Sequence, residues 1–144
     1  MADTQTPTPY FTSEWLLVEE EPVRQFATST YLNEKHVDMA VSRNNPLGGD
    51  LVDGFWMLSM LLYFHFKYVE RQSDKEYGFN YGLNKVRFIT PVMIGDEVRV
   101  TSEFLDEKPH GEGRLITTRN TMHVRGKEKP CMVADLLLLH LKAD

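Results

Sequence analysis

The chain has 144 residues, of which 42% are hydrophobic and 26% charged, the composition of an ordinary globular protein with room for one folded unit. Its formal net charge of -5 argues against a nucleic-acid or anionic-membrane partner, because both favour a basic patch. The single cysteine, Cys131, excludes an intrachain disulfide and an all-cysteine metal site, and it suits a reducing compartment such as the cytoplasm.

Residues 1–12 are rich in Thr and Pro and are expected to form a flexible N-terminus. They have no basic start and no apolar stretch, so a signal peptide is not expected. Ser13 is expected to cap a short turn. Glu19 to Glu21, followed by Pro22, predict the acidic first turn of a helix. The buried face of that helix would contain Val23, Phe26 and Ala27.

Residues 28–50 show no lasting period and contain Asn44–Asn45–Pro46 and Gly48–Gly49, which together predict a long loop. Residues 50–71 then predict one long helix that is apolar on almost every side. Its longest apolar run, residues 55–64, is too short to cross a bilayer, which needs about 20 residues. We therefore expect the helix to be buried on nearly every side.

After this helix the apolar residues recur with a period of two, which predicts strands. Val98, Val100 and Phe104 alternate with polar residues, and the segment from Cys131 to Leu141 is almost continuously apolar. A buried helix followed by several antiparallel strands predicts an α+β fold, with residues 13–144 forming one domain whose sheet is wrapped around the helix. A sheet this long with so apolar a last strand also favours pairing with a second copy.

Three motifs between residues 36 and 59 point to a known family. They are His36–Val37–Asp38, Pro46–Leu47–Gly48–Gly49 and Asp53–Gly54–Phe55–Trp56–Met57–Leu58–Ser59. At the same spacings the MaoC-like dehydratases, especially their nodulation-protein-N-like branch, carry His-Val-Asp, Pro-Phe-Gly-Gly and His-Gly-Phe-x-x-Leu-Ser. The segments 13–16, 80–96 and 129–135 resemble that branch as well. The resemblance spans residues 13–141 and implies a hotdog fold, a homodimer or higher homo-oligomer, and a pocket at the subunit interface.

The resemblance also implies a catalytic loop, whose sequence in the family is Asp-x-Asn-x-x-His. Its Asp and His hold a water that adds across an α,β-unsaturated thioester, one group taking a proton while the other gives one. In this chain Asn33 and His36 occupy the matching positions, but Tyr31 stands where the family has Asp. A phenol has an ordinary pKa of about 10, so Tyr31 is a poor base at neutral pH.

A second departure is Asp53, where the family usually has His. By the resemblance, the Gly54 amide that follows would donate to the substrate carbonyl oxygen, aided by the helix dipole. Asp53 could be the relocated base or the N-cap of the helix, since Asp is a favoured capping residue, and the two roles are compatible.

Other residues of these motifs have two possible roles. Tyr31 is expected to line the pocket. Asn33 and Ser59 either orient substrate groups or bond to the local backbone. Substrate contact is possible for Phe55, Trp56 and Tyr81, although the core is their more ordinary place. No metal-ligand spacing connects the remaining histidines, so neither a metal nor a redox cofactor is expected. Those histidines are His65, His110, His123 and His140.

The resemblance implies a hydro-lyase that acts on a β-hydroxyacyl or enoyl compound, either a thioester of coenzyme A or of a carrier protein, or a related carbonyl compound. His36 would move a proton, Tyr31 or Asp53 would supply the partner group, and the Gly54 amide would stabilise the oxyanion. Because the family's Asp is replaced, the same pocket could instead run thioester hydrolysis, isomerisation or cyclisation. A non-catalytic binding protein is a third possibility.

Overall fold

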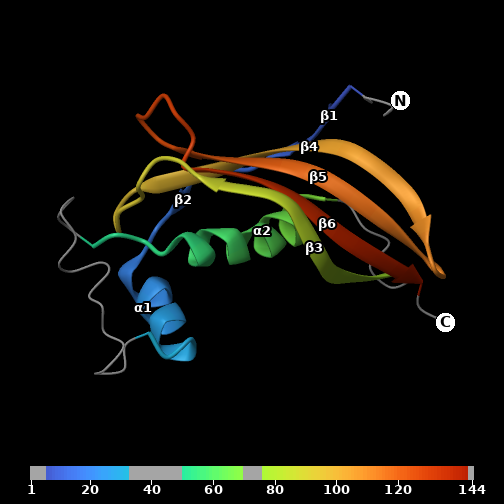
Figure 1. The fold of residues 1–144 in the computed structure, drawn as a ribbon. Helices are drawn as coiled ribbons and strands as arrows, with labels where there is room; N and C mark the ends of the chain where they lie inside the picture. Colours follow the sequence, from blue (N-terminus) through green and yellow to red (C-terminus); the bar gives the residue numbers. More distant parts are fainter. Residues whose placement is uncertain (1–5, 33–49, 70–75, 143–144) are drawn as a thin grey trace.

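The computed structural model describes residues 6–32, 50–69 and 76–142 (Figure 1). The elements in chain order are β1 (Thr8–Thr12), β2 (Leu16–Leu17), α1 (Glu20–Ser29), α2 (Gly54–Tyr68), β3 (Glu76–Phe88), β4 (Glu97–His110), β5 (Gly113–Val124) and β6 (Met132–Lys142). Neither described helix combines the length and the apolar character that a membrane span requires.

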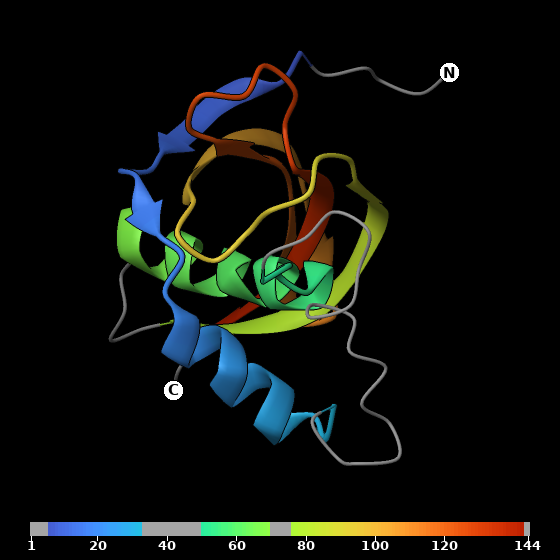
Figure 2. The same ribbon diagram turned by 90° about the vertical axis from the view of Figure 1, so that its left-hand side faces the viewer.

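The strands form one antiparallel sheet in the order β1-β4-β5-β6-β3, with β2 also paired to β4. The end-on view of Figure 2 shows the sheet curling around α2, while α1 lies on the side of α2 away from the sheet's long strands. This confirms the predicted α+β architecture with a sheet wrapped around a central helix. β3 is an edge strand, and its outer side pairs with no other described strand.

The core lies between α2 and the concave face of the sheet. The predicted alternation in β4 is confirmed, because Val98 and Val100 are buried while Arg99 between them is half-buried. From α2, the buried side chains are Trp56, Met57, Leu61, Phe64 and His65. The concave face is apolar except for a small buried set of polar side chains on β4 and β5, which are Ser102, Thr118 and Asn120.

The central helix begins four residues later than predicted. Instead of continuing the helix, residues 50–52 run extended beside residues 92–94: Val52 N–H donates to the Val92 carbonyl oxygen at 2.8 Å, and Ile94 N–H donates to that of Asp50 at 2.9 Å. Asp53 is also extended and caps the helix that starts at Gly54. The apolar period alone missed this boundary, because apolar residues occur in both the paired segment and the helix.

We predicted that the central helix is buried on nearly every side, and this is wrong for a single copy of the chain. One stripe of α2 is exposed: Phe55 is 65% exposed, Phe66 44% and Tyr63 40%, and Ser59 belongs to the same stripe. These positions recur every three or four residues, so they share one face of the helix. The structure therefore leaves large aromatic side chains of this face partly open to solvent.

The N-terminal region is more ordered than predicted. Thr8–Thr12 form β1 and pair with β4, so the expected flexible terminus is wrong for these residues. Ser13 does not cap a turn, because its hydroxyl accepts from Val100 N–H at 2.9 Å and donates to the Glu14 carbonyl oxygen at 2.8 Å. The helix predicted after the acidic triplet is confirmed as α1, although the side chains expected to be buried on it are only half-buried.

Candidate active site

The first turn of α2 presents a backbone N–H that no described residue accepts. Asp53 Oδ1 accepts from Phe55 N–H at 2.8 Å, which confirms the capping role. Gly54 N–H has no acceptor among the residues that the structure describes. Free N–H groups at a helix start lie at the positive end of the helix dipole and favour a negatively charged or polarised oxygen. This amide can therefore bind a carbonyl oxygen and stabilise negative charge on it.

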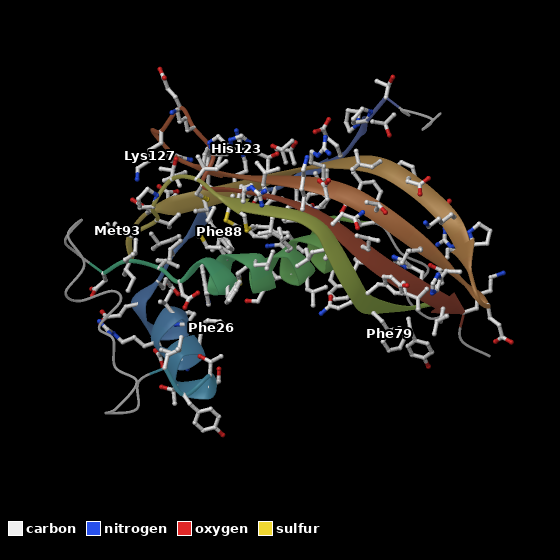
Figure 3. The ribbon with its side chains drawn as sticks, in the orientation of Figure 1. Phe26, Phe79, Phe88, Met93, His123 and Lys127 are labelled. Carbon is white, nitrogen blue, oxygen red and sulfur yellow. The ribbon has the colours of Figure 1, made fainter. Side chains whose placement is uncertain are left out.

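An aromatic ring from the end of β3 covers this turn. A Cβ atom added at Gly54 would lie 2.9 Å from two ring carbons of Phe88, closer than real Cβ atoms approach other atoms. Figure 3 shows Phe88 beside the start of α2. Glycine thus allows the ring to lie this close, and any larger residue would require the Phe88 side chain to shift. Phe88 lies in the segment 80–96 that resembles the family, but the sequence alone assigns it no role, because the two residues are far apart in the chain.

Two cavities adjoin this turn and meet at Phe55, which lines both. The first, about 350 Å³, lies between the start of α2 and residues 88–92 and includes Asp53 and Gly54 in its wall. The second, about 340 Å³, is a groove between α2 and β3. Half of its lining residues are leucines, and Ser59, Asn80 and Tyr81 are the polar members. Together they provide a polar end at the helix start and an apolar extension along the helix.

The three aromatic residues considered for substrate contact differ in their burial. Trp56 is 6% exposed and belongs to the core, which confirms the more ordinary of its two predicted places. The core reading is wrong for Phe55 and Tyr81, which are 65% and 50% exposed and line the groove. Ser59 also lines the groove, while its hydroxyl donates to the Trp56 carbonyl oxygen at 2.7 Å. It therefore makes the local backbone bond foreseen for it.

Tyr31 has an unusual backbone conformation, with φ 64°. It follows Thr30, the C-cap of α1. Tyr31 N–H donates to the Thr28 carbonyl oxygen at 3.2 Å and Leu32 N–H to that of Ala27 at 2.9 Å. These two bonds close the helix in the pattern that usually places glycine at the left-handed position. The Tyr31 side chain is 69% exposed. The other two predicted loop residues, Asn33 and His36, lie outside the described residues.

Replacing Tyr31 with glycine is expected to raise the free energy of unfolding by about 1 kcal/mol. A left-handed conformation costs a residue with a Cβ roughly 1–2 kcal/mol, and the greater chain entropy of unfolded glycine offsets part of the gain. Urea denaturation measures the change. Tyr31→Ala is the matched control, because it also removes the phenol but keeps the strained Cβ. Equal stability of the two variants would contradict the strain.

Asp53→Ala is expected to lower the free energy of unfolding by about 1 kcal/mol, because it removes the acceptor for Phe55 N–H. Asp53→Asn retains an acceptor oxygen and should keep most of this stability. The two variants together separate the capping role of Asp53 from a role in chemistry. If Asp53→Asn loses turnover while its stability is unchanged, the carboxylate acts as a base. Urea denaturation and steady-state kinetics of both variants provide the two measurements.

The other candidate groups do not form a second reactive centre in the described part of the chain. Burial raises the pKa of the Cys131 thiol to about 12, so it stays protonated and is a weak nucleophile. His65 is buried and bonded to Asn120, so it is a side chain of the core. Across the described residues, no three His, Cys, Asp or Glu side chains are grouped so that they could hold a metal ion.

Comparison with known proteins agrees with the motifs. The sequence profile of the family described as "MaoC like domain" matches residues 2–125. The chain is 33% identical over 131 residues to 3-hydroxyacyl-thioester dehydratase Z of Mycobacterium tuberculosis, covering 90% of this chain and 86% of that protein. It is 29% identical to Nodulation protein N of Rhizobium leguminosarum bv. viciae, covering 88% and 81%.

Solved structures share the architecture. The MaoC-like dehydratase from Rhodospirillum rubrum superposes with a TM-score of 0.71 at 16% identity, covering 99% of this chain and 96% of that one. The (R)-hydratase of A. caviae superposes with a TM-score of 0.64 at 17% identity, covering 95% and 98%. These likenesses establish the fold as the hotdog fold of the MaoC-like dehydratases, as the motifs implied.

Proposed function

The chain belongs to the MaoC-like dehydratase family, and we propose from this membership that it is a hydro-lyase whose substrate is an enoyl or 3-hydroxyacyl thioester. Its homologue from M. tuberculosis is named as a dehydratase of 3-hydroxyacyl thioesters. In the hydration direction, the oxygen of water forms a bond to C3 of the enoyl group and a proton is added to C2. Dehydration breaks the same two bonds in reverse.

The observation that carries the proposal is the Gly54 N–H at the positive end of α2, which no described residue accepts and which lies in the wall of a cavity of about 350 Å³. Negative charge develops on the thioester oxygen as water attacks C3, and an N–H aimed at that oxygen stabilises it. The apolar groove that begins at Phe55 offers room for an acyl chain. A polar donor followed by an apolar groove suits a fatty-acyl substrate.

The proton-transfer groups are assigned by the motif and by the chemistry of the side chains. His36 is proposed to exchange a proton with the reacting water, because an imidazole has an ordinary pKa near 6.5 and can both accept and donate at neutral pH. Tyr31 can donate a hydrogen bond to the water. Asp53 uses Oδ1 for capping, but a carboxylate has further lone pairs that can accept from the water.

We also propose that two copies of the chain assemble into a homodimer through β3 and the exposed stripe of α2. β3 is a 13-residue edge strand, and its exposed side chains include Tyr77 and Phe79. Figure 3 shows Phe79 projecting outward from β3. A long apolar edge strand favours pairing with another strand. The β3 edge of a second copy has the same length and the same apolar side chains, so it can pair with the first. Sedimentation velocity should therefore give twice the monomer mass.

Incubation of the protein with (E)-2-butenoyl-CoA tests the proposed reaction. Loss of the enoyl-thioester absorbance without release of thiol is the expected result, and the product should be the 3-hydroxybutanoyl thioester. Release of free thiol, detected with a disulfide reagent, would instead identify thioester hydrolysis. Absence of both reactions with CoA and carrier-protein thioesters of several chain lengths would contradict the proposal.

A further inference from the structure

The Phe88 ring lies against the residue whose N–H is proposed to hold the substrate oxygen. Three neighbouring ring carbons, Cδ1, Cε1 and Cζ, lie 2.9–3.1 Å from the Cβ position that Gly54 leaves empty. The ring therefore packs directly on the Gly54 backbone, with no gap that a methyl group could enter. Both residues belong to the wall of the cavity of about 350 Å³. A ligand bonded to Gly54 N–H must share that cavity with the ring.

The fold around Phe88 fixes the position of its ring. Phe88 is the last residue of β3 and pairs with Met132 of β6. The next residue, Ile89, donates its N–H to the Cys131 carbonyl oxygen at 2.8 Å. Met132 and Cys131 are both 0% exposed, so this end of β3 is anchored to the core. The Phe55 ring meets the Phe88 ring edge-to-face, with 6.1 Å between centroids, and supports it on a second side.

Covalent geometry decides which part of the substrate comes close to this ring. A carbonyl oxygen bonded to Gly54 N–H lies about 2.9 Å from the amide nitrogen, and C2 of the acyl group is only two bonds from that oxygen. The acyl side of the carbonyl must point toward Phe55, because the apolar groove begins there. Since the Phe55 and Phe88 rings are in contact, C2 passes beside this aromatic pair, whereas the carbons beyond C3 extend into the groove.

We infer that Phe88 determines specificity at C2: its ring leaves room for hydrogen on this carbon and excludes a methyl branch. This inference rests on the proposed function, because it takes the thioester oxygen to lie at Gly54 N–H. A branch at C2 would have to displace the ring, and the ring cannot retreat toward Gly54, where the space is already filled. Displacement in the opposite direction would lose the contact with Gly54. Phe88 has no group that exchanges a proton, so its role is selection and not chemistry.

Hydration of (E)-2-butenoyl-CoA and (E)-2-methyl-2-butenoyl-CoA by the wild type and by Phe88→Ala tests the inference. In the wild type, kcat/KM for the branched substrate should be lower by roughly 10–200-fold, the usual range for one extra carbon in a hydrophobic pocket. Phe88→Ala should reduce this ratio about tenfold, because removal of the ring leaves space for the branch. The different intrinsic reactivities of the two substrates cancel when the ratio is compared between the two proteins.

Phe79→Ala is the matched control, because Phe79 is a phenylalanine of the same strand with similar exposure, 50% against 45% for Phe88, and lines neither cavity. Its ratio should equal that of the wild type. Phe88→Leu keeps most of the apolar volume and should give an intermediate ratio, which keeps the test decisive should Phe88→Ala fail to fold. A wild-type ratio in the Phe88 variants, each active on the unbranched substrate, would overturn the inference while leaving the proposed function intact.

Calorimetric binding of butanoyl-CoA and 2-methylbutanoyl-CoA provides a second measurement that needs no turnover. The wild type should bind the branched thioester about tenfold more weakly, and Phe88→Ala should bind the two with nearly equal affinity. Equal affinities already in the wild type would contradict the inference. A preference that is present in the wild type and lost in Phe88→Ala, in a protein that hydrates neither enoyl thioester, would instead refute only the proposed reaction.

Discussion

Replacing His36 with alanine is expected to lower kcat/KM for enoyl-thioester hydration by roughly 10²–10⁴-fold, the usual contribution of a general acid or base. The proposed reaction moves a proton from water to C2 of the substrate, and Gly54 N–H can stabilise charge but cannot exchange that proton. The phenol of Tyr31 is a poor base near neutral pH because its ordinary pKa is about 10. An imidazole is therefore the group best suited to this step.

Steady-state kinetics with His36→Ala and His36→Gln measure this loss. Both variants should retain the wild-type urea denaturation midpoint if the residue acts in chemistry and not in folding. His123→Ala is the matched control, since His123 lies on β5 opposite Arg99 of β4, away from both cavities. Unchanged turnover in the His36 variants would remove this residue from the mechanism.

Asn120→Ala is expected to cost about 2–3 kcal/mol in free energy of unfolding, the largest stability effect anticipated for a polar substitution in this chain. The change removes the acceptor of His65 Nε2–H and the donor to the Ala134 carbonyl oxygen, and Asn120 is 0% exposed. A buried polar group that has no hydrogen-bond partner is removed from water without compensation, which costs about 1–3 kcal/mol for each group.

Urea denaturation of Asn120→Ala, His65→Ala and the double variant measures how strongly the two side chains depend on each other. The double variant should lose less stability than the sum of the two single losses, because either single change already breaks the His65–Asn120 bond. Thr121→Ala is the control on the adjacent, less buried position of the same strand. Additive losses would show that the bond contributes little to stability.

Much of the architecture could be predicted because its strongest signals are local. The alternation of Val98 and Val100 with polar neighbours places one face of β4 on the core, and the apolar run after Cys131 became the inner strand β6. Helix α1 was foreseen from its acidic first turn and Pro22. Such patterns depend on periodicity and on helix-end chemistry within a few residues.

Features that depend on distant contacts were missed or misplaced. The helix start was set by the pairing of residues 50–52 with residues 92–94, which no short window of sequence contains. Thr8–Thr12 lack an apolar period but pair with β4 through their backbone. For the candidate site, the sequence offered Asp53 as a cap or as a base, and the structure confirms the cap, whereas the covering of Gly54 by Phe88 needed the fold.

The closure of α1 at Tyr31 depends on the backbone more than on the side chain. Backbone bonds to Thr28 and Ala27 set the direction of the chain there, and the Tyr31 side chain contributes little to holding it, being 69% exposed. Exchange of the side chain should therefore leave the neighbouring peptide path intact, so this position should tolerate replacement more readily than a buried one.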